Sequence, residues 1–209
     1  MTVAEFLGTA ALAVVMYTMI ARTSFPLFSA LAAGGTLAIL SITMGLEGNG
    51  LHLNPALTLG LWTTKKVKTI QAIVMIIAQM LGGLAAWGLL KYFLGHSLQS
   101  MAGTSFAWKV LIAEAIGAGF FTFGVASAVL QGLGQARTAA VAGTSLFLGI
   151  LIASIGSNAI INPAVAVGVQ SWNWAYAAGP IIGGIVGVAL YGLLFAPVSV
   201  VAKKTTRKK

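Results

Sequence analysis

The 209-residue sequence predicts an all-α membrane protein with six transmembrane helices and two re-entrant half-helices in a 3+3 inverted repeat. Composition, the lengths of the apolar runs and the recurrence of short motifs support this prediction. Hydrophobic residues make up 58% of the chain and charged residues 7%, whereas soluble domains carry about 25% charged residues. Because so few charges cannot cover a globule of this size in water, most of its surface is expected to face lipid.

Six apolar runs approach the length of about 20 residues that a membrane-spanning helix needs. They are residues 3–21, 26–46, 69–90, 110–130, 138–155 and 175–201. A signal peptide would place basic residues before its apolar run, whereas the first basic residue here, Arg22, follows it. The first run is therefore expected to remain as a helix.

Two shorter apolar runs, 53–63 and 162–172, can cross only about half a membrane, since a helix rises 1.5 Å per residue. Both begin with one tripeptide, formed by Asn54, Pro55 and Ala56 in the first run and by Asn162, Pro163 and Ala164 in the second. Asparagine is a strong N-cap, and proline suits the first position of a helix. We interpret both runs as re-entrant helices.

Short motifs recur in the same order in the two halves of the chain. The sequence around Glu5 recurs around Glu114, the Asn-Pro-Ala tripeptide recurs, and the polar and small residues near Gln79 are echoed near Pro180. Each half then holds three spans and one half-helix, and an odd number of spans inverts the second half. We expect one domain over 1–202, with repeats at about 3–90 and 109–201, followed by a basic tail at 203–209.

The placement of lysine and arginine predicts the orientation of the chain in the membrane. Nine of the twelve basic residues fall on the side of the termini: Lys65, Lys66, Lys68, Arg137, Lys203, Lys204, Arg207, Lys208 and Lys209. Cytoplasmic loops carry such an excess, so both termini are expected to be cytoplasmic, in the plasma membrane. The tail is interpreted as a solvated topology determinant, with a lipid-binding polybasic patch as the alternative.

Composition also excludes several classes of function. The chain has no cysteine, two histidines and three acidic residues, which leaves no disulfide, no thiolate chemistry and little material for a metal site. No nucleophile and base can be paired, so we expect neither an enzyme nor a cofactor. The net charge of +9 comes from short clusters between apolar runs, and nucleic acid is not an expected partner.

The paired tripeptides suggest a chemistry if the two half-helices meet end to end inside the membrane. Asn54 and Asn162 would then each direct two free amide hydrogens at one point, where two positive helix ends also converge. A neutral hydroxylated solute or water gains hydrogen bonds there, whereas a cation meets a positive field. This predicts a pore for neutral solutes. A secondary transporter with inverted repeats and a non-conducting structural membrane protein are the alternatives.

With these motifs, the chain from about 3 to 201 resembles the aquaporin, or major intrinsic protein, family. The first loop, Gly50 to Ala56, is similar to the family's first loop, although Asn49 stands where a serine is usual. The second loop, Asn162 to Gly168 followed by Ser-Trp-Asn-Trp, is most like that of plant tonoplast intrinsic proteins. The resemblance implies a right-handed helical bundle and a homotetramer in the lipid bilayer, with one pore in each subunit.

The resemblance also implies a selectivity filter at four positions, which counting from the two tripeptides assigns to Gly34, Ile150, Ala159 and Val165. A shift of one residue in this count would give Gly35 or Gly149 as the alternatives to Gly34 and Ile150. The arginine usual in the family is absent at Val165. Such a filter would be wide and apolar, and would pass glycerol, urea, ammonia or hydrogen peroxide as well as water. Ile150, Ala159 and Val165 match a filter pattern of tonoplast intrinsic proteins.

Three further polar residues are expected to brace the loops. Glu5 and Glu114 lie inside predicted spans, where an ionisable group is costly and is a functional candidate. Their equivalent places in the two repeats favour a role as acceptors for the non-helical backbone of the loops, over a proton or cation relay. His52, two residues before Asn54, is expected to fix the turn, with a pH-sensitive gate as the alternative.

Overall fold

The computed structural model describes residues 2–45, 51–103 and 105–195, and the regular elements in these ranges are all helices. Six of them are long and apolar enough to cross a membrane. They are α1 (Thr2–Arg22), α2 (Pro26–Met44), α4 (Thr69–Leu94), α5 (Trp108–Gln131), α6 (Gln135–Ala153) and α8 (Trp174–Phe195). The predicted all-α membrane fold is confirmed, and each span overlaps its predicted run.

The ends of the spans differ from the predicted ends by a few residues. α4 continues about one turn beyond residue 90 and stops at Gly95, whose φ of 71° provides a left-handed C-cap. α5 ends in the same way at Gly132, with a φ of 67°. The predicted ends of the second and last spans, at 46 and 201, lie outside the described residues, as do Asn49, Gly50 and the basic tail at 203–209.

The two half-helices are α3 (Pro55–Thr63) and α7 (Pro163–Gly168), and α7 is shorter than predicted. Each is followed by a non-glycine residue with positive φ, Lys65 at 61° and Gln170 at 58°. The next N–H in each case, of Lys66 and Ser171, donates to a carbonyl five residues earlier at 2.9 Å. This turn closes both half-helices, and it was missed because no glycine or asparagine marks it.

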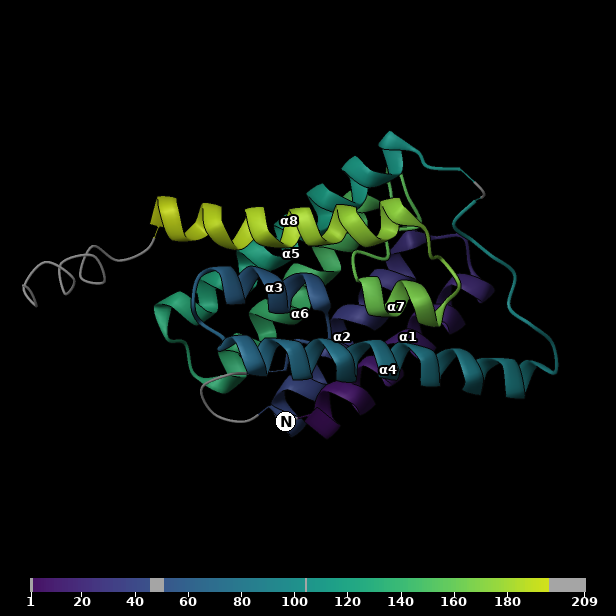
Figure 1. Ribbon diagram of the computed structural model, residues 1–209, viewed down its shortest axis with the longest axis horizontal. Helices are drawn as coiled ribbons and strands as arrows, with labels where there is room; N and C mark the ends of the chain where they lie inside the picture. The colour runs from purple at the N-terminus through teal and green to yellow at the C-terminus, as the bar shows by residue number, and fades with distance from the viewer. Residues whose placement is uncertain (1, 46–50, 104, 196–209) are drawn as a thin grey trace, which may run out of the picture.

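The half-helices lie end to end in the middle of the bundle, between α4 and α8 (Figure 1). α3 contacts α8 and α4, α7 contacts α4, α1 and α8, and the two half-helices contact each other. The long helices pack mainly in the pairs α5 with α8, α2 with α6, and α1 with α4. Loops that are distant in sequence thereby meet at the centre of the fold.

Reciprocal close contacts relate the two halves. A Cβ on Gly34 of α2 would lie 2.5 Å from the carbonyl oxygen of Gly143 in α6, and a Cβ on Gly143 would lie 2.5 Å from that of Gly34. Gly83 likewise faces the carbonyl of Ala164 at the start of α7, and Gly184 faces that of Ala56 at the start of α3. Glycine permits these backbone approaches because it lacks a Cβ.

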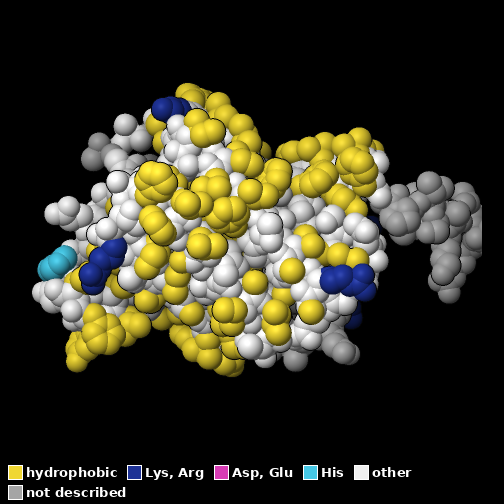
Figure 2. Space-filling model, turned by 180° about the vertical axis from the view of Figure 1, so that it is seen from behind, with side chains coloured by type: hydrophobic (Ala, Val, Ile, Leu, Met, Phe, Trp, Pro, Cys, Tyr) yellow, Lys and Arg dark blue, Asp and Glu magenta, His cyan; other side chains and the backbone are white. Residues whose placement is uncertain are grey.

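Many large apolar side chains lie on the outer surface. In the view of Figure 2, hydrophobic side chains form patches across this face, and lysine and arginine lie toward the two ends of its long axis. Large apolar side chains on all six spans are exposed, among them Leu31, Ile73, Ile116 and Leu193. This distribution is typical of a protein whose surface faces lipid along most of its length.

Candidate functional site

The two Asn-Pro-Ala tripeptides form the N-termini of the half-helices. The backbone N–H of Ala56 donates to Oδ1 of Asn54 at 2.9 Å, so this asparagine caps α3. Oδ1 of Asn162 accepts from Ala164 at 3.0 Å and from Val165 at 3.3 Å, and caps α7. In both helices proline follows the cap, at the position where its missing N–H costs nothing.

Each asparagine also binds the opposite loop. Nδ2 of Asn54 donates to the carbonyl oxygen of Ile161 at 2.9 Å, and Nδ2 of Asn162 donates to that of Leu53 at 2.7 Å. Leu53 and Ile161 have φ values of 52° and 43°, which L-residues with side chains rarely adopt. This strain accompanies carbonyls that serve as acceptors across the junction of the loops.

These bonds correct one detail of the predicted pore chemistry. We expected both amide hydrogens of each asparagine to be free, but one is used by the opposite loop. An amide NH₂ has two hydrogens. Within the described residues, the second amide hydrogen of each asparagine has no acceptor. Each asparagine thus keeps one donor at the point where the two positive helix ends meet.

The two membrane-embedded glutamates hold the loop backbones. Oε1 of Glu5 accepts from the backbone N–H of His52, and Oε2 accepts from that of Leu53, both at 2.8 Å. Glu114 accepts from the N–H of Ile160 at 3.0 Å and from that of Ile161 at 2.5 Å. These N–H groups lie in non-helical backbone within the fold, where an unpaired donor would be costly.

Beside the first loop, a polar cluster surrounds Glu5. Nε2 of Gln79 in α4 donates to Glu5 at 2.7 Å and lies 3.0 Å from Oγ1 of Thr58 in α3. Thr58 is also 3.0 Å from Nδ1 of His52, which is 3% exposed. His52 therefore connects the first loop to α3.

The sequence analysis did not assign Gln79 and Thr58 to the site. A buried glutamine in an apolar span was the available signal, because such a side chain needs partners inside the protein. A second group was also missed at the other loop. Tyr176 accepts from the N–H of Asn158 at 3.0 Å, and Nδ2 of Asn158 donates to Ser171 at 3.0 Å.

Three of the four filter candidates lie around the second loop. Ile150 is in the last turn of α6, Ala159 precedes α7, and Val165 is in its first turn. All are at most 3% exposed, and Ala159 has a φ of 55°. All three side chains are aliphatic.

Gly34, the fourth candidate, is directed at a neighbouring helix and not at the second loop. Its Cβ position points at the backbone of α6, where it would lie 2.5 Å from the carbonyl oxygen of Gly143 and 3.0 Å from Cβ of Phe147. The neighbouring Gly35 has nothing within 4 Å of its Cβ position. It lies on the outer face of α2 with Leu31 and Ile39, which are 62% and 63% exposed.

Within the described ranges, no three residues among His, Cys, Asp and Glu come close enough together to hold a metal ion. Glu5 and Glu114 are instead occupied by the loop N–H groups.

Comparison with known proteins identifies the family. A family model described as "Major intrinsic protein" matches residues 1–191. The chain belongs to this family. Its relatives include a "Probable aquaporin TIP-type" of Medicago truncatula, 31% identical over 195 residues that cover 84% of this chain and 74% of the relative. "Aquaporin TIP1-1" of Arabidopsis thaliana is also 31% identical, with the same coverage.

The fold of this major intrinsic protein also matches a solved structure. That structure, of the aquaglyceroporin from Plasmodium falciparum, aligns with a TM-score of 0.71, at 18% identity and 98% coverage of both chains. The aquaporin family and this fold identify a multi-pass membrane channel and favour passive passage of water and small solutes over the carrier alternative. The predicted resemblance to tonoplast-type aquaporins is likewise confirmed.

Proposed function

We propose that this major intrinsic protein is a passive channel for water and for small neutral solutes such as glycerol, urea, ammonia or hydrogen peroxide. The observation that carries the proposal is the meeting of Asn54 and Asn162, each with one amide hydrogen left over, at the facing ends of two half-helices. A neutral solute with an oxygen or nitrogen lone pair can accept a hydrogen bond from each of these two amide groups in turn. Two positive helix ends oppose the passage of cations at the same point.

The contacts of the two glutamates support bracing rather than ion relay. Each carboxylate accepts two backbone N–H bonds and one side-chain bond, from Gln79 in one case and Ser157 in the other. A relay group must exchange these partners for a proton or an ion during each cycle. That exchange would leave the backbone N–H groups of the loops without an acceptor. We therefore propose that Glu5, Glu114 and His52 hold the loops and that no ion gradient drives flux.

The proposed filter is apolar and has no arginine. Ile150, Ala159 and Val165 form it around the second loop, and Ala33 is proposed as the α2 position in place of Gly34. Ala33 is 1% exposed and is one residue from Gly34, so its side chain points about 100° away from the α6 contact. Because this filter is wide and lacks a strong donor, it penalises solutes less by size and more by desolvation, so larger neutral solutes gain relative to water.

The test is a stopped-flow comparison of water, glycerol, urea and ammonia in proteoliposomes, normalised to folded channel. We expect all four to permeate, at rates independent of membrane potential and, for water, glycerol and urea, independent of an imposed pH gradient. Val165→Arg should narrow the filter and restore a strong donor, which favours water over glycerol and urea, and Val165→Met, which adds length without a donor, is the matched control. Flux that follows an ion gradient would replace the channel by a carrier.

Orientation, membrane and assembly are part of the same proposal. The excess of basic residues on the side of the termini supports cytoplasmic termini. The plasma membrane is proposed as the location. A homotetramer with one pore in each subunit is proposed from the family. Protease access to the basic tail in intact cells, membrane fractionation, and the mass of the complex in mild detergent test these three points. An accessible tail, recovery with an internal membrane, or a monomer would contradict them in turn.

A further inference from the structure

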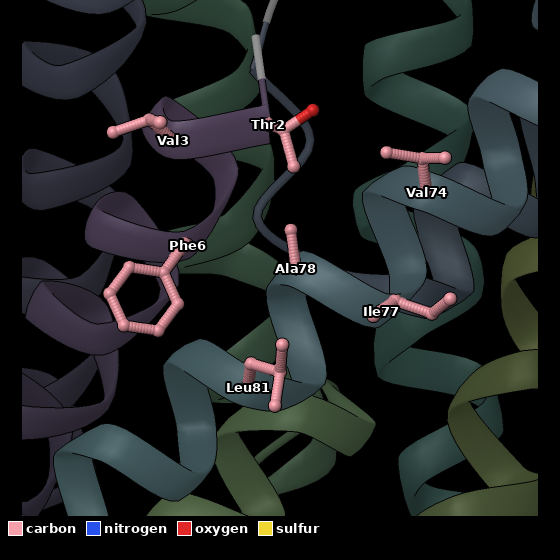
Figure 3. Close-up of a pocket in the computed structure, with 7 residues that line it drawn as sticks. All are labelled: Thr2, Val3, Phe6, Val74, Ile77, Ala78 and Leu81. Atoms are coloured by element: carbon pink, nitrogen blue, oxygen red, sulfur yellow. The ribbon is translucent and has the colours of Figure 1, made fainter.

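A groove on the outer surface lies between the first turns of α1 and the first half of α4 (Figure 3). It has a volume of about 340 Å³ and is lined by Thr2, Val3, Phe6, Val74, Ile77, Ala78 and Leu81. The Thr2 hydroxyl is the one polar side-chain group among these lining residues. Val3, Ile77 and Leu81 are at least half exposed, so the groove opens on the lipid side of the bundle.

The groove has the direction and length of part of a lipid chain. From Val74 to Leu81 the axis of α4 advances about 10 Å, roughly a third of the hydrocarbon thickness of a bilayer. One end of the groove, near Thr2 and Val74, lies toward the start of both helices. The other end, near Phe6 and Leu81, lies further along both helices (Figure 3). An extended segment of an acyl chain matches this length and the apolar lining.

Three lysines precede the end of the groove that lies toward the start of both helices. Lys65, Lys66 and Lys68 are exposed and lie just before α4, whose first groove residue, Val74, is about 9 Å further along the axis from Lys68. Trp62, 40% exposed with its Nε1–H on Thr69, lies at the same end of the helix. Tryptophan concentrates at the membrane–water boundary, so the lysines are at the level of lipid headgroups.

The charges of the described surface distinguish lipid from a second copy of the chain. Glu5 and Glu114 are fully buried, so no exposed acidic residue is present in residues 2–45, 51–103 and 105–195. A second copy that covered the groove would bring no described carboxylate to the three lysines. An anionic phospholipid supplies both the missing negative charge and the apolar chain.

We propose that this groove is a binding site for an anionic phospholipid, with an acyl chain between α1 and α4 and the headgroup at Lys65, Lys66 and Lys68. The site is separate from the channel centre and does not depend on the proposed permeants. Lipid bound there covers α4 beside Ala78 and Gln79, and Gln79 holds Glu5 of the first loop.

Native mass spectrometry of the purified full chain, titrated with dioleoyl phosphatidylglycerol or with zwitterionic dioleoyl phosphatidylcholine, tests the proposal. We expect at least tenfold tighter binding of the anionic lipid. The triple variant K65Q/K66Q/K68Q should lose most of that preference, since each basic residue near the surface contributes about fivefold. The matched variant R22Q/K91Q/K109Q removes three charges from the other end and should retain it.

The apolar part of the site has its own test. Val74→Trp fills the groove and should lower binding of phosphatidylglycerol at least tenfold, whereas Val186→Trp, at a similarly exposed valine of α8, should leave it unchanged. Ile77→Trp replaces Val74→Trp if that variant does not fold. Equal binding of the two lipids, or full binding by either test variant, would overturn the proposal.

Two further outcomes would also overturn it. A change of oligomeric mass in Val74→Trp with no change in lipid binding would assign the groove to a second copy. Loss of the lipid preference only when the five basic residues of the tail are replaced by glutamine would assign the lipid to the tail. Water permeability of each variant, measured in parallel, separates this result from the channel proposal.

Discussion

The two halves of the channel hold their loops by different means. In the first half, Glu5 is part of a cluster with Gln79, Thr58 and His52, and these polar groups connect α1, α4, α3 and the loop. The equivalent positions in the second half are Pro180, Ala166 and Ile160, which provide no side-chain polar group. The repeated fold therefore conserves the carboxylate and the asparagine cap, while the support around them differs.

The second half replaces the missing polar groups with local contacts. Ser157, from the second loop itself, donates to Glu114 at 2.7 Å and lies 3.1 Å from the carbonyl of Ala153. Asn158 donates to the carbonyl of Met101 at 2.7 Å, which attaches the loop to the connection between α4 and α5. The first loop is thus supported from neighbouring helices, and the second from its own residues and an outer connection.

The largest effect is expected from removing the carboxylates. Glu5→Ala leaves the N–H groups of His52 and Leu53 and one amide hydrogen of Gln79 without an acceptor, while the other amide hydrogen of Gln79 keeps its bond to Thr58. Glu114→Ala leaves two N–H groups, because Ser157 retains its bond to Ala153. Each buried unsatisfied donor costs about 1–3 kcal/mol, so E5A should lower the unfolding temperature in detergent more than E114A.

A matched set of variants sharpens this comparison of the carboxylates. Glu5→Gln and Glu114→Gln each keep one acceptor oxygen and should fall between the alanine variants and the unmodified protein. Water flux per folded channel should stay independent of a pH gradient in all four variants. A smaller loss in E5A than in E114A would show that the polar cluster does not depend on Glu5.

The next effect concerns the contact that the two halves share. Gly34→Ala and Gly143→Ala each place a methyl group 2.5 Å from a carbonyl oxygen of the other half, and overpacking of this kind costs about 1–3 kcal/mol. Gly35→Ala, which meets nothing within 4 Å, is the matched control and should be neutral or slightly stabilising. Thermal unfolding in detergent measures all three.

The same variants decide the α2 position of the filter. If Ala33 lines the pore, Ala33→Val should reduce glycerol permeation relative to water, and Gly34→Ala should change stability without that change in selectivity. The reverse result, with a stable Gly34→Ala channel that excludes glycerol, would restore Gly34 to the filter.

Hydropathy and capping made most of the fold predictable, because they depend on residues that are close in the sequence. The six spans follow from run lengths, and both half-helix starts follow from Asn-Pro-Ala. The short α7 was not predictable, since its end depends on Gln170 adopting a positive φ. Gly34 shows a second limit: counting along α2 gives a position, whereas the direction of a side chain depends on where α6 crosses.

The polar contacts follow the same distinction. Glu5 and Glu114 were singled out because a charge within an apolar span needs a partner, and the motif repeat indicated the two loops. Gln79 and Thr58 are 21 residues apart, and no periodicity in the sequence indicates that α3 turns back against α4 to bring them together. Such contacts depend on tertiary packing.

A moderate effect is expected from the asparagine caps, and it should be unequal. Asn54→Ala removes one bond to a nine-residue helix, whereas Asn162→Ala removes bonds to Ala164 and Val165 at the start of a helix of six residues. A lost cap costs about 1 kcal/mol, so both variants lose stability, Asn162→Ala more. Normalised water flux should fall in both, because each also loses its remaining donor, and unchanged flux would contradict the proposed role.

The smallest effect tests whether the first half can work with the apolar surroundings of the second. Thr58→Ala introduces the residue that the second half has at Ala166. Gln79 keeps its bond to Glu5, and the backbone of His52 keeps its acceptor, so the loss is confined to the threonine contacts. Since each of the lost neutral hydrogen bonds, to His52 and to Gln79, contributes about 0.5–1.5 kcal/mol, we expect a smaller fall in unfolding temperature than in E5A, with water flux retained. Thr58→Ser, which keeps the hydroxyl, should behave like the unmodified protein. A loss as large as that of E5A would mean that His52 and Thr58, rather than the carboxylate, position the first loop.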